Sequence, residues 1–221
     1  MSSPAPDTPS TPPSTPPSAP PIFLPSFGGY LGEPGGLPGV SFWPRVGARV
    51  IDLVVHYVAS FFAGILFVIL LAAASGGHIS PELFFKMRHT GFTGVFLALL
   101  GSVAYHVICT SIHGSSLGKL ALSMVVVQED GSPCRFGSAV IRELGYFVDA
   151  LFFGLIGYFA MQKTPQEQRH GDEWARTVVC KRSSLPPEKL RGAGQFILGL
   201  MLAVMADAAL AMVGLLLAVS S

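Results

Sequence analysis

The sequence predicts an all-α transmembrane protein: a bundle of three or four membrane segments with a small extramembrane pairing of two β-strands. Hydrophobic residues make up 50% of the chain and charged residues 12%, whereas a globular domain carries about 25% charged residues. Four apolar stretches each approach the ~20 residues that span a bilayer as a helix. Two short runs rich in β-branched residues lie outside these stretches.

Residues 1–41 form the first predicted segment, a disordered tail. It is rich in Pro, Ser and Thr as far as Pro21 and in Gly and Pro after it. Such a composition cannot bury a core, so we expect a solvated chain without regular structure. The tail lacks the basic and apolar regions of a secretory signal, so the first long apolar run is expected to stay in the membrane. Trp43 marks the expected membrane interface.

The four apolar stretches are residues Val50–Ala74, Phe92–Ile112, Ala139–Met161 and Phe196–Val219. The first, second and fourth predict plain transmembrane helices. The third contains Gly145, Gly154 and Gly157. These glycines allow a broken or re-entrant helix where protein or water covers the freed backbone.

The two β-branched runs are Leu122–Gln128, which is followed by turn residues, and Thr177–Cys180. An isolated strand leaves its backbone unpaired, so the runs are predicted to pair with each other, in either the antiparallel or the parallel sense. Both must then lie on the same face of the membrane although the third apolar stretch separates them. One clean crossing by that stretch cannot satisfy this condition, which favours the re-entrant interpretation.

The distribution of Lys and Arg gives an independent test of this topology, since these residues concentrate in the cytoplasm. With a re-entrant third stretch and a cytoplasmic amino terminus, of the 14 basic residues only Lys86 and Arg88 lie outside. Simple alternation with the amino terminus outside is the alternative, and it places five basic residues outside. We therefore expect a multi-pass protein of a bacterial-type inner membrane with its amino-terminal tail in the cytoplasm.

Ionisable residues inside the apolar stretches are the candidate functional residues, because charges within a membrane normally face a bundle interior or a wet cavity. The candidates for a proton or cation path are Asp52, His56, His106, Asp149 and Asp207. Asp52 and His56 share one helix face with Ser60 and Gly64, and we expect this face to meet the face that carries His106. The alternative is structural: Asp52 and Asp149 pair with Arg45, Arg49 or Arg142 and fix the positions of the helices. Asp207 has no such partner within its own helix.

Other functional classes receive no support from the sequence. Cys109, Cys134 and Cys180 lie far apart without metal-ligand spacing, so we expect neither a disulfide framework nor a metal, and no cofactor. The segment Gly114–Leu120 has too few residues between its glycines for a phosphate-binding loop. We expect no enzyme activity, and a formal charge of +1 gives no reason to expect nucleic acid.

Four motifs in order resemble the RDD family of small membrane proteins, which is named for one arginine and two aspartates. The motifs are Arg45–Asp52, Ser116–Lys119 with the following strand, Phe136–Asp149 and Gln168–Val179. The resemblance implies an RDD-like membrane domain over residues 42–182, followed by a linker and an additional carboxy-terminal transmembrane helix over residues 183–221. It also implies that Arg45, Asp52 and Asp149 are the signature residues and that Asp172 and Thr177 belong to the closing motif. Arg176 stands where the family pattern favours glycine.

Two functional hypotheses remain open. In the first, the protein moves or senses a proton or cation through its intramembrane Asp and His residues. In the second, it is a scaffold without transport activity that associates with lipid and with other membrane proteins or further copies of itself. Its buried Asp residues and the arginines Arg49 and Arg142 are then structural.

Overall fold

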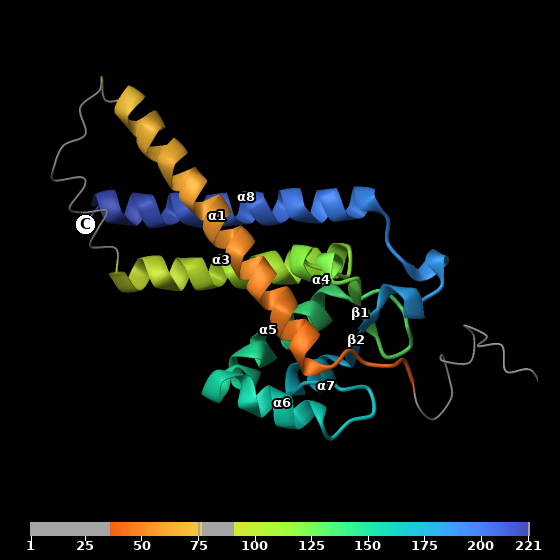
Figure 1. The fold of residues 1–221 in the computed structure, drawn as a ribbon. Coiled ribbons are helices and arrows are strands. Elements are labelled where there is room, and N and C mark those ends of the chain that lie inside the picture. The colour runs from red at the N-terminus through yellow and green to blue at the C-terminus, as the bar shows by residue number, and fades with distance from the viewer. Residues whose placement is uncertain (1–35, 75, 77–90, 221) are drawn as a thin grey trace, which may run out of the picture.

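The computed structural model describes residues 36–74, 76 and 91–220, and most of this part of the chain is helical (Figure 1). The predicted tail over residues 1–35 lies outside the described residues. The first helix, α1, extends over Phe42–Ala74, so its 33 residues correspond to a length of about 50 Å. Its apolar side chains from Val50 to Leu70 are largely exposed. This pattern fits the predicted first span.

Helices α3 (Gly91–Ile112) and α8 (Ala193–Ser220) lie side by side in opposite directions. Glycines form their seam: Gly199 meets Cys109 and Ile112, and Gly214 meets Leu97. Residues Thr93–Ile112 and Pro187–Gly214 are long and apolar enough to cross a membrane. With the broken pair described next counted as one span, the described residues hold up to three candidate spans.

The third apolar stretch is broken in the middle. Helix α5 (Phe136–Asp149) and helix α6 (Leu155–Met161) meet at a bend of 100°. The intervening turn, Leu151–Gly154, contains three consecutive residues with positive φ. A right-handed helix cannot continue through left-handed residues, so the stretch changes direction there, as the glycine content predicted.

The two predicted strands pair in the antiparallel sense. Strand β1 covers Met124–Gln128 and strand β2 covers Thr177–Lys181, with Val126 opposite Val179 at the centre. Each strand follows a short helix: α4 (Leu117–Ala121) precedes β1, and α7 (His170–Ala175) precedes β2. Both ends of the α5–α6 pair therefore connect to one sheet.

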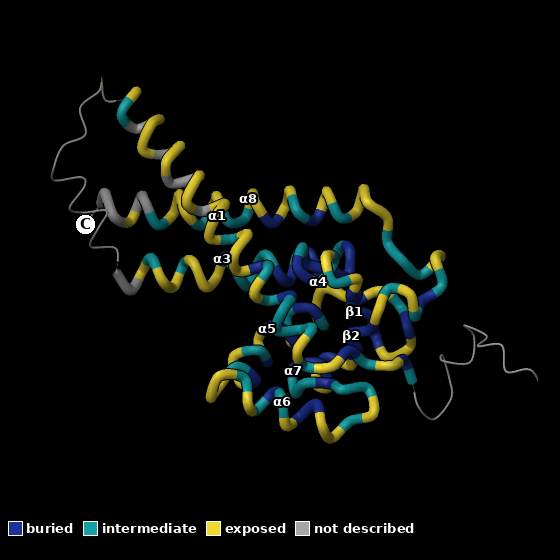
Figure 2. The backbone as a smooth tube through the Cα atoms, viewed as in Figure 1, coloured by how far each residue is buried: buried dark blue, intermediate teal, exposed yellow. Residues whose placement is uncertain are grey.

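The core lies around this sheet (Figure 2). Met124, Val126 and Val179 belong to one buried cluster, and Val125, Val127, Val178 and Cys180 belong to a second. Successive strand residues point to opposite faces, so both faces of the sheet are covered. This explains why the strands consist of continuous apolar runs rather than alternating ones.

The end of the predicted tail needs a correction. Leu37 and Val40 are buried, one in each cluster, and the Val40 N–H donates to the Val179 carbonyl over 2.8 Å. Two apolar side chains and one free strand edge are enough to hold residues 36–41 against the sheet. The Gly- and Pro-rich composition of this segment hid those two anchors.

Two short 3-10 helices, Arg182–Ser184 and Pro187–Lys189, connect β2 to α8. Leu185 between them is buried beneath the sheet. At the end of this connection Arg191 donates to the Ser111 carbonyl at the end of α3, and the rings of Phe196 and His113 stack edge to face. These contacts fix the start of α8 beside the end of α3.

Glycines allow the closest approaches between helices. A Cβ at Gly118 would lie 1.9 Å from the Ala48 carbonyl oxygen, and one at Gly171 would lie 2.6 Å from the Arg142 carbonyl oxygen. The short helix α4 therefore touches the backbone of α1, and α7 touches the backbone of α5. Neither contact leaves room for a side chain.

The first prediction tests this requirement. The substitution Gly118→Ala should destabilise the protein by about 1–3 kcal/mol, because the added methyl group forces α4 away from α1. The measurement is the thermal unfolding midpoint of the detergent-solubilised protein. Gly137→Ala is the matched control, since nothing lies within 4 Å of a Cβ at Gly137 in α5. Equal midpoints for the two variants would contradict the prediction.

Candidate functional site

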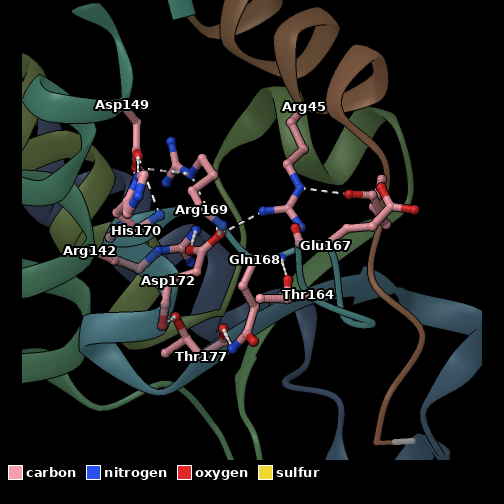
Figure 3. A network of polar contacts seen from close by, with 12 residues as sticks. Arg45, Arg142, Asp149, Thr164, Glu167, Gln168, Arg169, His170, Asp172 and Thr177 are labelled. Atoms are coloured by element: carbon pink, nitrogen blue, oxygen red, sulfur yellow. Dashed lines mark hydrogen bonds and ion pairs between the residues drawn. The ribbon is translucent and has the colours of Figure 1, made fainter. Parts of the chain in front are cut away.

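A buried aspartate in α7 is the centre of the polar network (Figure 3). Asp172 has no exposed surface, and it forms ion pairs with three arginines. Arg45 Nη1 lies 2.6 Å from Asp172 Oδ2, Arg142 Nη2 lies 2.9 Å from Oδ1, and Arg169 Nε lies 3.5 Å from Oδ2. The arginines come from the start of α1, from α5 and from the residue before α7. One carboxylate therefore connects three parts of the chain.

The charge balance decides the protonation of Asp172. Burial alone would raise its pKa, but Arg142, Arg169 and Arg45 outweigh burial and hold the pKa of the Asp172 carboxyl well below its usual range. The carboxylate is thus ionised at every physiological pH. It can neither bind nor release a proton under those conditions, so its role is structural.

Arg45 also bonds to backbone oxygens. Its Nε donates to the Val40 carbonyl over 2.7 Å and its Nη2 donates to the Glu167 carbonyl over 2.7 Å. Arg45 therefore joins the segment before α1 to the segment before α7. In the same region the Gln168 side chain donates to the Thr177 carbonyl over 3.0 Å, at the start of β2.

The two signature aspartates, Asp52 and Asp149, have one task in common: each carboxylate accepts hydrogen bonds from the first turn of a short helix. Asp52 accepts from the Gly118 N–H over 2.7 Å and from the Ser116 hydroxyl over 2.6 Å, at the start of α4. The Tyr105 hydroxyl donates to the same carboxylate over 3.0 Å. N–H groups in the first turn of a helix have no acceptor within that helix. Asp52 supplies this acceptor for α4.

Asp149 does the same for α7. It accepts from the N–H groups of His170 and Gly171 over 3.3 and 3.2 Å. The His170 Nδ1 atom lies 3.0 Å from Asp149 Oδ1, and the His170 ring is partly exposed. Arg169 Nε lies 3.9 Å away on the other oxygen.

These partners correct the predicted arginine pairings. Among the described residues Asp52 pairs with no arginine, since its oxygens accept from α4 and Tyr105. Arg142 does not reach Asp149 along its own helix, because the close contact between Gly145 and Gly171 brings Asp172 to the Arg142 side of α5. Arg49 forms an ion pair with Glu143 at 2.5 Å, and its guanidinium lies 4.1 Å from the centre of the Tyr146 ring.

The five candidates for a proton path do not form one group. His106 is buried, with Nδ1 3.9 Å from Asp52 Oδ2. Asp207 lies apart from them in the α3–α8 seam, against Gly101. The predicted face of α1 meets the His106 face at Asp52, whereas His56, one turn further along α1, is partly buried and makes no hydrogen bond or ion pair with any described residue. For Ser60 and Gly64, on the same face of α1, the structure describes only their place in the helix.

Sequence reasoning missed Arg169, His170 and Glu143 as members of the network. Arg169 and His170 stand beside Asp172 in the closing motif, and Glu143 follows Arg142 directly. Their proximity to motif residues was a usable signal. Within the described residues, no group of three or more His, Cys, Asp or Glu side chains could hold a metal ion.

Together, the apolar helices and the buried Arg–Asp network define a small helical membrane protein in which two carboxylates hold short helices beside a two-stranded sheet. The model of the RDD family matches residues 40–176, and the chain belongs to this family. No curated protein and no solved structure matches the chain. The signature residues Arg45, Asp52 and Asp149 thus fall on the network and on the two helix caps.

The second prediction concerns the centre of the network. Asp172→Asn should destabilise the protein by about 3–5 kcal/mol, because three buried arginines lose their common counter-charge. Glu173→Gln is the control, since Glu173 is the next residue of α7 and its side chain is exposed; it should stay within about 0.5 kcal/mol of the unmodified protein. Chemical unfolding in detergent measures both. A large loss in the control, or none in Asp172→Asn, would contradict the assignment.

The third prediction follows from the low pKa of Asp172. A carboxyl whose folded pKa is depressed stabilises the fold fully above its unfolded pKa of about 3.9, and this stabilisation is lost as the pH falls toward the folded pKa. The difference in unfolding free energy between the unmodified protein and Asp172→Asn should therefore be constant near neutral pH and shrink below about pH 4. A difference that already shrinks near pH 6 would argue against an ionised, arginine-bound carboxylate.

Proposed function

We propose that this RDD-family protein moves or senses a proton or a monovalent cation, and that Asp207 of α8 is the group that exchanges it. The observation that carries the proposal is the position of this carboxylate in the seam between α3 and α8. A Cβ at Gly101 would lie 2.1 Å from Asp207 Oδ1, so the carboxylate lies directly over the backbone of α3. Asp207 makes no hydrogen bond or ion pair with a described residue.

An unpaired carboxylate in this place needs an explanation. Placing an ionised Asp at the centre of a transmembrane helix costs roughly 2.5–3.5 kcal/mol on insertion scales. The cost falls when the group is protonated or holds a cation, and it returns when the proton or cation leaves. A group with these alternatives is suited to exchange, whereas the Asp172 carboxylate, which three arginines hold in its ionised form, is not.

Polar side chains continue from Gly101 along α3 toward the sheet. Tyr105 lies one helical turn beyond Gly101 and donates to Asp52, and His106 lies 3.9 Å from the same carboxylate. This row would provide proton donors and acceptors between the seam and the sheet side of the molecule. His56 and Asp149 lie outside the row and have no part in the proposal.

The proposed orientation follows the distribution of basic residues. It puts the amino-terminal tail and the sheet in the cytoplasm of a cell with a bacterial-type inner membrane. The row from Tyr105 to Asp52 would then open toward the cytoplasm. No catalytic role is part of the proposal.

A scaffold is the second candidate, because one observation favours it. Helix α1 diverges from α3 and α8 (Figure 1), and most of its described apolar residues from Val50 to Leu70 are exposed (Figure 2). Such a surface could pack against another membrane protein or a second copy of this chain. In that case Asp207 would pair with a basic residue of the partner.

The fourth prediction separates the two candidates. Proteoliposomes with an internal pH dye should show a cation-dependent pH change, and Asp207→Asn should reduce its rate at least tenfold while Asp130→Asn, in an exposed turn, leaves it unchanged. The reason is that an amide cannot take up or release the proton. An undiminished rate in Asp207→Asn would remove Asp207 from the exchange. If the unmodified protein shows no flux but Asp207→Asn forms smaller assemblies, the scaffold is favoured.

A further inference from the structure

One arrangement occurs twice in this chain: an aspartate of one helix caps a short second helix, which leads into a strand. Each occurrence is called a unit below. Arg45, Ala48 and Asp52 in α1 have the same spacing as Arg142, Gly145 and Asp149 in α5, displaced by 97 positions. In both helices the carboxylate caps a short helix. In both, the small residue one turn before it lies at the contact with a glycine of that short helix.

The short helices and strands repeat as well. The residues before α4 and α7, Ser116 and Arg169, both have φ of −77°, with ψ of 172° and 167°. Ser123 and Arg176, directly before β1 and β2, have φ of 54° and 52°. The two members of each pair are 53 positions apart, as are the contact glycines Gly118 and Gly171. Glycine adopts this left-handed backbone most readily, although the residues at these two positions are Ser and Arg.

Contacts between the two units follow the pattern that a pseudo-two-fold axis between them would give. The same displacement of 53 positions takes Val126 to Val179, which face each other at the centre of the antiparallel ladder. The displacement of 97 takes Arg49 to Tyr146, and these two side chains also touch. Equivalent residues that meet each other are what a two-fold axis between the units requires.

The units differ in the segment between the capping aspartate and the short helix. In the first unit this segment contains the rest of α1 and all of α3. In the second unit it contains only the turn Leu151–Gly154, helix α6 and a loop. The α5–α6 pair therefore occupies the place of the α1–α3 hairpin but is much shorter. Both pairs start and end beside the sheet.

We propose that α5 and α6 form a membrane-inserted hairpin that enters the bilayer from the side of the sheet and returns to it, with the turn Leu151–Gly154 in contact with lipid. In Figure 1 this turn lies on the side of the strands toward which α3 and α8 extend. The equivalent hairpin of the first unit contains a candidate span. The α5–α6 pair of the second unit enters the same membrane from the same side but does not cross it.

The exposure of the turn Leu151–Gly154 supports contact with lipid. Phe152 and Phe153 are 72% and 104% exposed, at least as much as Val204 at 60% in the candidate span of α8. Asp149, which is buried, is the only charged residue between Leu144 and Gln162. Two large rings that point out of the chain, without a charge beside them, fit lipid tails better than water.

Backbone conformation and neighbours agree with this placement. Phe152 and Phe153 have φ of 52° and 59°, a region that bulky residues rarely adopt. Glycine or asparagine would form the turn with less strain, and contact of the two rings with lipid would offset that strain. Phe42 packs on Tyr158 of α6, next to Trp43, where an interfacial aromatic residue was predicted.

Spin labels can test the position of the turn in the full-length protein in liposomes. Cysteines placed at Phe153 and, as a second site, at Phe147 carry the label, and the native cysteines are replaced by serine or alanine. Val204→Cys is the lipid reference and Asp130→Cys is the water reference. Collision rates with oxygen and with a water-soluble nickel complex are measured at each site.

We expect the Phe153 label to collide more often with oxygen than with the nickel complex, as at Val204, with a ratio several-fold above that of Asp130. A nickel collision rate equal to that of Asp130 would place the turn in water and overturn the proposal. Low rates for both reagents would place it against protein, for instance a second copy, and would also overturn it. None of these outcomes depends on Asp207, so the result is independent of the proposed exchange function.

Discussion

Asp172 is completely buried, and a buried carboxylate persists only where positive charge and hydrogen bonds compensate its lost hydration. Arg45, Arg142 and Arg169 provide that compensation from three parts of the chain that are far apart in sequence. Loss of Asp172 would leave three arginines without their common counter-charge. The start of α1, the middle of α5 and the first turn of α7 must therefore keep their relative positions, and the sheet beside α7 follows from them.

Two further carboxylates extend this constraint. Asp52 and Asp149 accept hydrogen bonds from the free N–H groups at the start of α4 and α7. These two helices are too short to be stable alone. Each short helix delivers the chain into a strand, and the two strands pair. The glycine contacts at Gly118 and Gly171 allow the helices to approach closely enough for these bonds. The same arrangement thus occurs in both halves of the region that the family model matches.

Asp207 differs from all of these residues. It lies beyond the region matched by the family model, in α8, and its carboxylate rests on the backbone of α3 without a described partner. The contrast is one of contacts: three arginines surround the Asp172 carboxylate, whereas Asp207 makes no hydrogen bond or ion pair with a described residue. The proposed exchange function rests on that contrast, and the shared family region is the framework that holds α3 beside α8.

The sequence by itself determined the elements of this protein. Apolar length predicted the helices α1, α3 and α8, the β-branched runs predicted both strands, and the glycines of the third stretch predicted its break, because each of these signals is local. The order of four motifs was enough to indicate the family. Which partner each charge takes was decided only by the tertiary structure: Arg142 binds Asp172 instead of Asp149, Asp52 caps α4 instead of pairing with arginine, and Leu37 and Val40 anchor a segment of loop-like composition. Those contacts join residues distant in sequence, and their geometry depends on how closely glycines let helix backbones approach, which no local pattern contains.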